Sequence, residues 1–492
     1  MLLAERAENE RLRQIIKELQ RHRFGRRAES LPVEQLLLGL EDVEQVEAES
    51  FAREDAADPA KREARTRTRR SNRGALPAHL PRIEQIVDIE DQNCPCCASP
   101  LHVMGEDRSE RLDVIPAQFR VIVTRRPKYA CRACEESVVQ AAAPARLVEG
   151  GIPTEATVAH VLVSKYADHL PLYRQSRIYA RQGVNLDRST LADWVGKAAF
   201  LLKPVHERLF ERLKASDKLF ADETTAPVLD PGRGRTKTGQ LFAYARDDRP
   251  WGGIDPPGVA YLYAPDRKAE HPIRHLQGFV GILQVDGYAG YRVLAERNAV
   301  SLAFCWAHAR RKFYELSQSG PAPIATEALA RIAELYKIES DIRGHSSQDR
   351  HTARQERSRP IIEAFEPWLR EKLSLISQKT RLAEAIRYAL SRWAGLSRFL
   401  DDGRIEIDSN AVERSIRPIA LNRKNALFAG SDGGGEHWAT IASLIETAKL
   451  NGIDPYSYLA DVIARIVNGH PQSQLDDLLP WAYTPATLKA VA

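Results

Sequence analysis

Four cysteines stand in two Cys-x-x-Cys pairs, and their spacing is typical of a zinc site. Each pair presents two thiolates from one tight turn, and two such turns close a tetrahedral Zn²⁺ site. Four protein ligands leave the ion no open position, so this zinc is expected to be structural. Cys96 is a surplus thiol inside the first pair, and a strand hairpin over residues 120–128 fits between the pairs. The predicted ligands are Cys94, Cys97, Cys131 and Cys134.

Two aspartates, Asp222 and Asp286, indicate a second kind of metal chemistry. Asp222 lies in the middle of a strand-like run, KLFADETT, and Asp286 ends another, GILQVD. Aspartate is disfavoured in strands and costly to bury without a partner, so two such carboxylates in one sheet require a cation between them. Carboxylates that hold two Mg²⁺ (or Mn²⁺) ions can activate water or a 3′-hydroxyl for attack on a phosphodiester.

Such a site needs a third acid, and residues 405–417, IEIDSNAVERSIR, offer one. Asn410 is placed to cap a helix that carries Glu413 in its first turn. The same Asn-x-x-Glu spacing also fits a capping box, which is a structural role. Asp408 and Glu436 are alternative ligands, so these residues by themselves leave the choice of the third acid open.

The elements that carry these acids form a mixed sheet. Strand-like runs cover residues 218–225, 240–246 and 259–264, then a helix is expected near 272–278, and two more strands cover 281–286 and 300–305. Three strands joined by turns, a crossover and two further strands predict a mixed five-stranded sheet with helices on its faces. In that order the first and fourth strands can lie side by side, which brings Asp222 to Asp286.

The sheet domain is expected in two parts, residues 216–317 and 401–450. Helical periodicity over residues 318–400 predicts an α-helical insertion between them. Whether the insertion grips DNA, through Arg354, Arg357 or Arg359, is not decided by the sequence. His308, just past the fifth strand, has either a packing role or a role in the site.

The N-terminal third of the chain carries basic segments suited to DNA. Residues 1–30 predict a short coiled coil of about two heptads with a basic end, and residues 31–81 an acidic and then basic linker. Basic arms of this kind track phosphates or enter a minor groove, and the alternative is a solvated linker. The expected DNA contacts are Arg23, Arg26, Arg27, Arg67, Arg69 and Arg70.

Two further modules precede the sheet. Residues 82–140 form the zinc-finger domain, and residues 150–215 a helical domain with a helix-turn-helix. In the latter, a helix over 173–182 stops at Gly183, and a second helix begins near Ser189. That layout is typical of a major-groove reader, although packing alone also explains it. In the helix-turn-helix the expected DNA contact is Arg188. Cations near the acids are also expected to contact phosphates, namely Arg310, Arg311, Arg414, Arg417, Arg423 and Lys424.

Composition agrees with a multidomain α/β protein of the cytoplasm. The chain has 492 residues and a formal net charge of +5. Its six cysteines make no disulfide framework, which favours a reducing compartment. No signal peptide precedes the charged N-terminus, and no apolar run is long enough to span a bilayer, so no membrane partner is expected.

Long segments carry a resemblance to a known family. They stand in order along nearly the whole chain: RFGRRAE (23–29), PAHLPR (77–82), the CPxC…YACxxC zinc module, HLPLYRQ (169–175), ADET (221–224), VDGYAGY (285–291), CWAHARRKF (305–313), IDSNAVERSIRP (407–418), RKNALFAGSDGGGE (423–436) and SLIETAKLNGIDPYSYL (443–459). On these segments the chain resembles the transposases of the insertion-sequence-66 family.

The resemblance implies a DDE triad on a ribonuclease-H-like catalytic core. It makes Asp222, Asp286 and Glu413 the catalytic, Mg²⁺-binding residues, and residues 451–492 a C-terminal family element. It implies binding to terminal inverted repeats and to target DNA, strand cleavage and strand transfer, a homodimer or higher oligomer in the synaptic complex, and small accessory proteins encoded by the same element. The expected location is the bacterial nucleoid. Two alternatives are a catalytically inactive DNA-binding regulator derived from a transposase and a two-metal nuclease unrelated to mobility.

Overall fold

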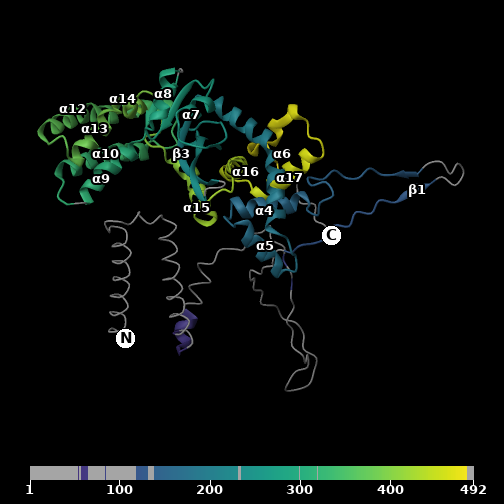
Figure 1. The fold of residues 1–492 in the computed structure, drawn as a ribbon. Helices are drawn as coiled ribbons and strands as arrows, with labels where there is room; N and C mark the ends of the chain where they lie inside the picture. The colour runs from purple at the N-terminus through teal and green to yellow at the C-terminus, as the bar shows by residue number, and fades with distance from the viewer. Residues whose placement is uncertain are drawn as a thin grey trace, which may run out of the picture. The chain divides into compact units, whose positions relative to one another are not determined.

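The structure is a computed structural model (Figure 1) that describes residues 118–130, 138–230, 234–297, 300–318 and 320–484, with short pieces between residues 54 and 84. The chain divides into two compact units, Met1–Ala117 and Gln118–Ala492. Several predictions lie outside the described residues: the coiled coil, the basic residues Arg23, Arg26, Arg27, Arg67, Arg69 and Arg70, and the zinc ligands Cys94, Cys97, Cys131 and Cys134.

The central element is a five-stranded sheet in the order β5-β4-β3-β6-β7. Strand β4 runs antiparallel to β3 and β5, whereas β6 is parallel to β3 and β7 is parallel to β6. The mixed sheet and the adjacency of its first and fourth strands are therefore confirmed. Its strands are β3 (Lys218–Asp230), β4 (Arg235–Arg246), β5 (Gly258–Ala264), β6 (Gly281–Val285) and β7 (Val300–Phe304). The first two are longer than predicted.

Helices pack along this sheet. Helix α15 lies against β3 and β4, while α16 and α6 lie against β5. The connections between strands carry η1 (Arg249–Trp251), α7 (Glu270–His275) and α8 (Ala289–Arg297). The helices that follow the insertion are α15 (Asn410–Ala426), α16 (Asp432–Leu450), α17 (Pro455–Val467), η4 (Gln472–Leu478) and η5 (Pro480–Ala482).

Two helices joined by a turn are found at the expected place before the sheet. Helix α4 (Glu155–Tyr166) is followed by α5 (Leu172–Arg181) and α6 (Arg188–Lys214). Gly183 has φ of +79° in the turn, a conformation that glycine adopts without steric cost. Helix α6 is much longer than a recognition helix requires, because its C-terminal part packs against β5 and α16 as part of the main core.

The helical insertion has its own hydrophobic core. Buried side chains from α9 through the residues just before α15 form one cluster that includes Trp306, Ile332, Phe365 and Ile386. Figure 1 shows α9, α10, α12 and α13 gathered together. The helices are α9 (Trp306–Gln318), α10 (Pro323–Asp341), α11 (Ser347–Ala353), η2 (Arg354–Ser358), α12 (Arg359–Leu375), α13 (Arg381–Leu390), α14 (Trp393–Ser397) and η3 (Arg398–Leu400).

The hairpin expected over residues 120–128 is not formed, because residues 118–127 contain no strand. A shorter hairpin is found instead, with β1 (Lys128–Ala130) antiparallel to β2 (Val138–Gln140). Its strands lie on the two sides of residues 131–137, which contain the second cysteine pair. Among the described residues, no helix combines the length and apolar composition needed to cross a membrane.

Burial along α6 gives a test of this fold. Leu209 is fully buried in the main core, whereas Phe200 on the same helix is 76% exposed. Leu209→Ala is expected to lower the free energy of unfolding by about 2–5 kcal/mol, because it removes buried methyl groups and leaves a cavity. Phe200→Ala should change it by only about 0.5 kcal/mol. Urea unfolding followed by circular dichroism measures both, and equal losses would contradict the packing of α6.

Candidate active site

Asp222 and Asp286 lie at matching positions on neighbouring parallel strands. Phe220 of β3 is paired with Gln284 of β6, and each aspartate lies two residues further along. Because side chains alternate between the two faces of a sheet, both carboxylates leave on the same side as this pair. Carboxylate oxygens of Asp222 and Asp286, together with one of Glu223, lie within 4.8 Å of one another. The structure thus brings the two predicted aspartates together.

Each of the two aspartates accepts a hydrogen bond from a backbone N–H. The N–H of Glu223 donates to Asp222 Oδ1 at 2.8 Å, and the N–H of Tyr288 donates to Asp286 Oδ1 at 2.9 Å. Burial, followed by the negative charges of Asp286 and Glu223, raises the pKa of Asp222 to about 8. A divalent ion bound among these oxygens would relieve both effects, because it replaces lost hydration and neutralises the repulsion.

Glu223 was missed by the sequence interpretation, which placed only one acid of ADET in the site. Its side chain is paired with Arg267, and the Tyr291 hydroxyl is 3.3 Å from Glu223 Oε2. Burial raises the pKa of Glu223, and its bond to Arg267 opposes this rise. The available clue was a second acid directly after Asp222 in a buried strand.

Glu413 lies in the first turn of α15, as predicted, but the helix is capped differently. The N-cap residue is Ser409, not Asn410, because Asn410 is already the first helical residue. The Ser409 hydroxyl donates to Glu413 Oε1 at 3.2 Å. The charge of Glu413 contributes to the raised pKa of Asp222, but Glu413 is not part of the group of oxygens formed by Asp222, Glu223 and Asp286.

The two alternative third acids are less well placed. Asp408 is engaged by Asn410, whose backbone N–H and side-chain Nδ2 donate to its two oxygens at 3.1 and 2.6 Å. Glu436 is exposed on α16. Glu413 contributes its charge to the raised pKa of Asp222, which favours it as the third acid.

His308 lies beside Glu413. Its Nδ1 is 3.7 Å from Glu413 Oε1 and has no hydrogen-bond partner among the described residues. Cys305, His308 and Glu413 bring ligand atoms within 4.8 Å of one another, and the Ser409 N–H donates to Cys305 Sγ at 3.3 Å. Thiol and imidazole donors suit softer transition metals, whereas the all-oxygen group around Asp222 suits Mg²⁺ or Mn²⁺.

The raised pKa of Asp222 predicts a pH-dependent stability in EDTA. The pKa of Asp222 is higher in the folded protein than in the unfolded chain, so folding takes up a proton at pH values between these two pKa values. The free energy of unfolding therefore falls as the pH rises through about 8. Asp222→Asn removes this dependence. The variant should therefore melt at a higher temperature than wild type near about pH 7, with a smaller difference near about pH 4. Scanning calorimetry at both pH values checks this, and a constant difference would contradict it.

Asp476→Asn is the matched control, because the pKa of Asp476 is shifted in the opposite direction to that of Asp222. Hydrogen bonds from Arg208 and Arg212 lower the pKa of Asp476, so its charged form contributes stability that is present at neutral pH and lost in acid. This variant should melt below wild type at neutral pH. The effect will be small, because the side chain is partly exposed to solvent.

The predicted DNA-binding cations fall into two groups. Arg423 is engaged inside the protein, since its Nη1 donates to the backbone carbonyl of Thr225 at 2.7 Å and so ties α15 to β3. The other predicted cations within the described residues lie on exposed surfaces, and their contacts with DNA stay predictions: Arg188, Arg310, Arg311, Arg414, Arg417 and Lys424.

Comparison with known proteins gives matches along most of the chain. The family model described as Transposase IS66 family matches residues 150–437, and the IS66 C-terminal element matches residues 443–481. The zinc-finger binding domain of transposase IS66 matches residues 91–135. A model described as Transposase C of IS166 homeodomain matches residues 11–84.

Two similar proteins come from Sinorhizobium fredii (strain NBRC 101917 / NGR234). The uncharacterized protein y4qI is 48% identical over 498 residues, which cover 98% of this chain and 91% of the relative. The uncharacterized protein y4jD is 49% identical over 438 residues, which cover 87% of this chain and 86% of the relative. Since the transposase model spans more than half of the sequence, the chain belongs to the IS66 transposase family.

Proposed function

We propose that this protein is a DNA transposase that binds the terminal inverted repeats of an insertion sequence and cuts and transfers DNA strands at a DDE triad. The triad is Asp222, Asp286 and Glu413. The observation that carries the proposal is the matching position of the two aspartates on adjacent parallel strands, with their oxygens within 4.8 Å. Family membership supports transposition over other phosphodiester chemistry.

The catalytic core is proposed to be ribonuclease-H-like. Three antiparallel strands are followed by two parallel strands, in the order β5-β4-β3-β6-β7, and helix α15 packs across β3 and β4. In this arrangement the first acid comes from the central strand, the second from the end of its parallel neighbour, and the third from a helix. The helical insertion interrupts the core between the second and third acids.

The proposed chemistry requires oxygen ligands, and the site provides them. Asp222 and Asp286 would hold the metal, and Glu413, in the first turn of α15, would be the third ligand. A bound Mg²⁺ or Mn²⁺ would supply activation of water or of a 3′-hydroxyl and stabilisation of the leaving oxygen in attack on a phosphodiester. The exposed cations Arg310, Arg311 and Arg414 neutralise the DNA strand.

The proposed partners follow from the modules before the core. The zinc finger, with structural Zn²⁺ on its four cysteines, and the helix-turn-helix recognise the inverted repeats. Joining two element ends requires two active sites, so a homodimer or larger assembly is expected in the synaptic complex. Small accessory proteins encoded by the same element are a further proposed partner.

The test is a strand-transfer assay on a labelled DNA fragment that carries one element end. A transposase nicks the fragment at the end in a Mg²⁺-dependent reaction and joins the freed 3′-hydroxyl to target DNA. Cleavage without joining indicates a nuclease. Specific binding with no cleavage in Mg²⁺ or Mn²⁺ indicates a regulator that has lost catalysis, and either result overturns the proposal.

A further inference from the structure

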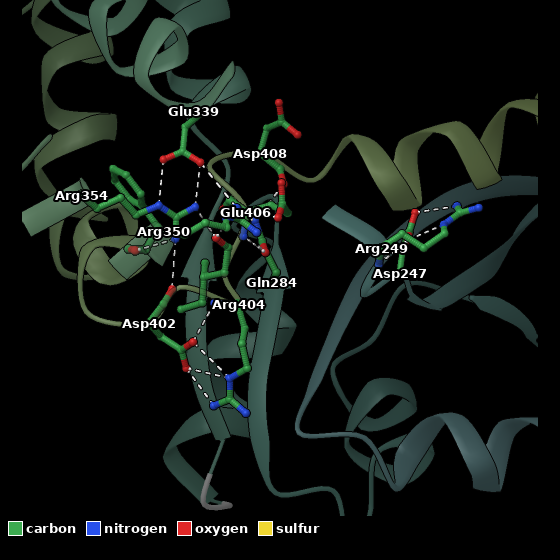
Figure 2. A network of polar contacts seen from close by, with 12 residues as sticks. Asp247, Arg249, Gln284, Glu339, Arg350, Arg354, Asp402, Arg404, Glu406 and Asp408 are labelled. Atoms are coloured by element: carbon green, nitrogen blue, oxygen red, sulfur yellow. Dashed lines mark hydrogen bonds and ion pairs between the residues drawn. The ribbon is translucent and has the colours of Figure 1, made fainter. Parts of the chain in front are cut away.

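Arg354 of the insertion is fully buried, and all five N–H groups of its guanidinium are hydrogen-bonded. Nε and Nη2 donate to the two carboxylate oxygens of Glu339 at 2.8 and 2.7 Å (Figure 2). Nη1 donates to the carbonyls of Phe399 and Asp402 at 2.9 and 3.1 Å, and Nη2 donates to that of Ile405 at 2.8 Å. Arg354 therefore has no donor left for DNA, which excludes the DNA contact considered for it.

The three carbonyls belong to residues 399–409, which lead from the insertion back to α15 and are called the return segment here. Arg350, which is also buried, makes a second contact with this segment. Its Nη2 forms an ion pair with Glu406 Oε1 at a distance of 2.8 Å. Gly403 lies so close to α11 that an added Cβ would be 1.7 Å from the carbonyl oxygen of Ser347. The insertion thus holds this segment by its backbone.

The sheet holds the return segment from its other side. Gln284 of β6 donates from Nε2 to the carbonyls of Glu406 and Asp408 at 2.6 and 2.8 Å, and its Oε1 accepts the Glu406 N–H at 3.2 Å. Next to the sheet, the backbone N–H of Trp306, the first residue of α9, donates to the carbonyl of Ile407 at 3.0 Å. Gln284 lies two residues before Asp286, on the same face of the sheet. The return segment is therefore hydrogen-bonded to the strand that leads directly into the second acid.

The return segment ends at Ser409, the N-cap of α15, whose hydroxyl donates to Glu413. The insertion also touches the second acid directly, because the Tyr388 hydroxyl of α13 donates to the carbonyl of Asp286 at 2.9 Å. The insertion therefore contacts Glu413 indirectly, through the return segment, and Asp286 directly, at its backbone carbonyl.

We propose that the helical insertion positions the active site, with Arg354 as the positioning residue that sets Glu413 against Asp222 and Asp286 through the return segment. This inference rests on the proposed function. A buried ion pair contributes little net stability compared with apolar packing, but its fixed geometry can select one arrangement of the chain. Glu413 follows Asp286 only after the whole insertion, so local sequence cannot place it. A displacement of about 1 Å is enough to reduce catalysis about 100-fold.

The test is Arg354→Lys in the full-length protein. Lysine keeps the charge beside Glu339 but cannot supply five N–H donors in a planar fork. At saturating end DNA and Mg²⁺, the cleavage rate should fall about 100-fold, while KM for the end DNA stays unchanged. Half-maximal activity should require more Mg²⁺, because Glu413 is no longer held at its ligand position. Arg370→Lys is the matched control, since it pairs with Glu366 on the exposed face of α12 and should cleave normally.

A second variant separates positioning from folding. Arg354→Met with Glu339→Leu removes the buried charges together, so neither is left unpaired. The carbonyls of Phe399, Asp402 and Ile405 lose their donor, so the melting temperature should fall. The variant should still fold and bind element ends, and it should lose cleavage as Arg354→Lys does. A folded variant that cleaves at the wild-type rate would overturn the inference, as would a change in KM alone.

Hydrogen exchange tests the inference apart from any activity. The amides of Ser409 and Glu413, which belong to the return segment and the first turn of α15, should exchange faster in Arg354→Lys than in Arg370→Lys. Unchanged exchange at these amides overturns the inference. If wild type shows no cleavage, the proposed function fails, and the exchange result still decides the structural role of Arg354.

Discussion

Asp222→Ala is expected to reduce Mg²⁺-dependent cleavage of element-end DNA about 1,000-fold and to leave the affinity for that DNA nearly unchanged. Loss of a metal-binding carboxylate removes several kcal/mol of transition-state stabilisation, and about 4 kcal/mol corresponds to this factor. End binding is assigned to modules that precede the sheet, so it should survive. Single-turnover cleavage of a labelled end fragment and a parallel gel-shift titration measure the two quantities.

Asp230→Ala is the matched control, because it makes the same change at the far end of the same strand, β3. It should cleave like wild type. Glu413→Ala and Glu436→Ala form a second pair that decides the third acid: the first should match Asp222→Ala, and the second should match wild type. If Asp222→Ala retains wild-type cleavage, that residue is not part of the triad and the two-metal proposal loses its first ligand.

The sheet and its first two acids could be predicted because their signals are local. Alternating apolar runs define β3 and β6, and an aspartate in or at the end of such a run is unusual enough to stand out. Once the strand order is guessed, the pairing of Phe220 with Gln284 places Asp222 and Asp286 together. The helix that carries Glu413 could be predicted as well, but the residues alone left three acids open.

What could not be predicted depends on tertiary neighbours. For Arg354 the sequence left a DNA contact open, since nothing in its local sequence shows that Glu339 and three carbonyls from the return segment surround it. The N-cap of α15 was misplaced by one residue, because Ser409 and Asn410 are both good capping residues. Glu223 was not considered as a site residue, yet carboxylate oxygens of Glu223 and Asp222 lie within 4.8 Å. Strand alternation alone would point the two side chains to opposite faces.

The second large effect is expected at the zinc finger, from Cys131→Ser. The paired strands β1 and β2, with Ala130 opposite Val138, come directly before and after residues 131–137, whose sequence contains the second cysteine pair. A serine hydroxyl is a poor substitute for a thiolate, and a structural zinc supplies about 10–16 kcal/mol of folding free energy in small fingers. The variant should therefore lose its zinc, and its affinity for element ends should fall about 10–100-fold.

Zinc content by atomic absorption and end binding by gel shift measure this effect. Strand transfer from pre-nicked DNA should be affected less than binding. Cys96→Ser is the matched control, since it removes a thiol from the same finger that the predicted ligand set does not use. It should keep zinc and bind ends normally. If Cys96→Ser loses zinc while Cys97→Ser keeps it, the first pair is Cys94 with Cys96. If Cys131→Ser binds ends with undiminished affinity, the finger does not take part in recognition, and the helix-turn-helix must carry it.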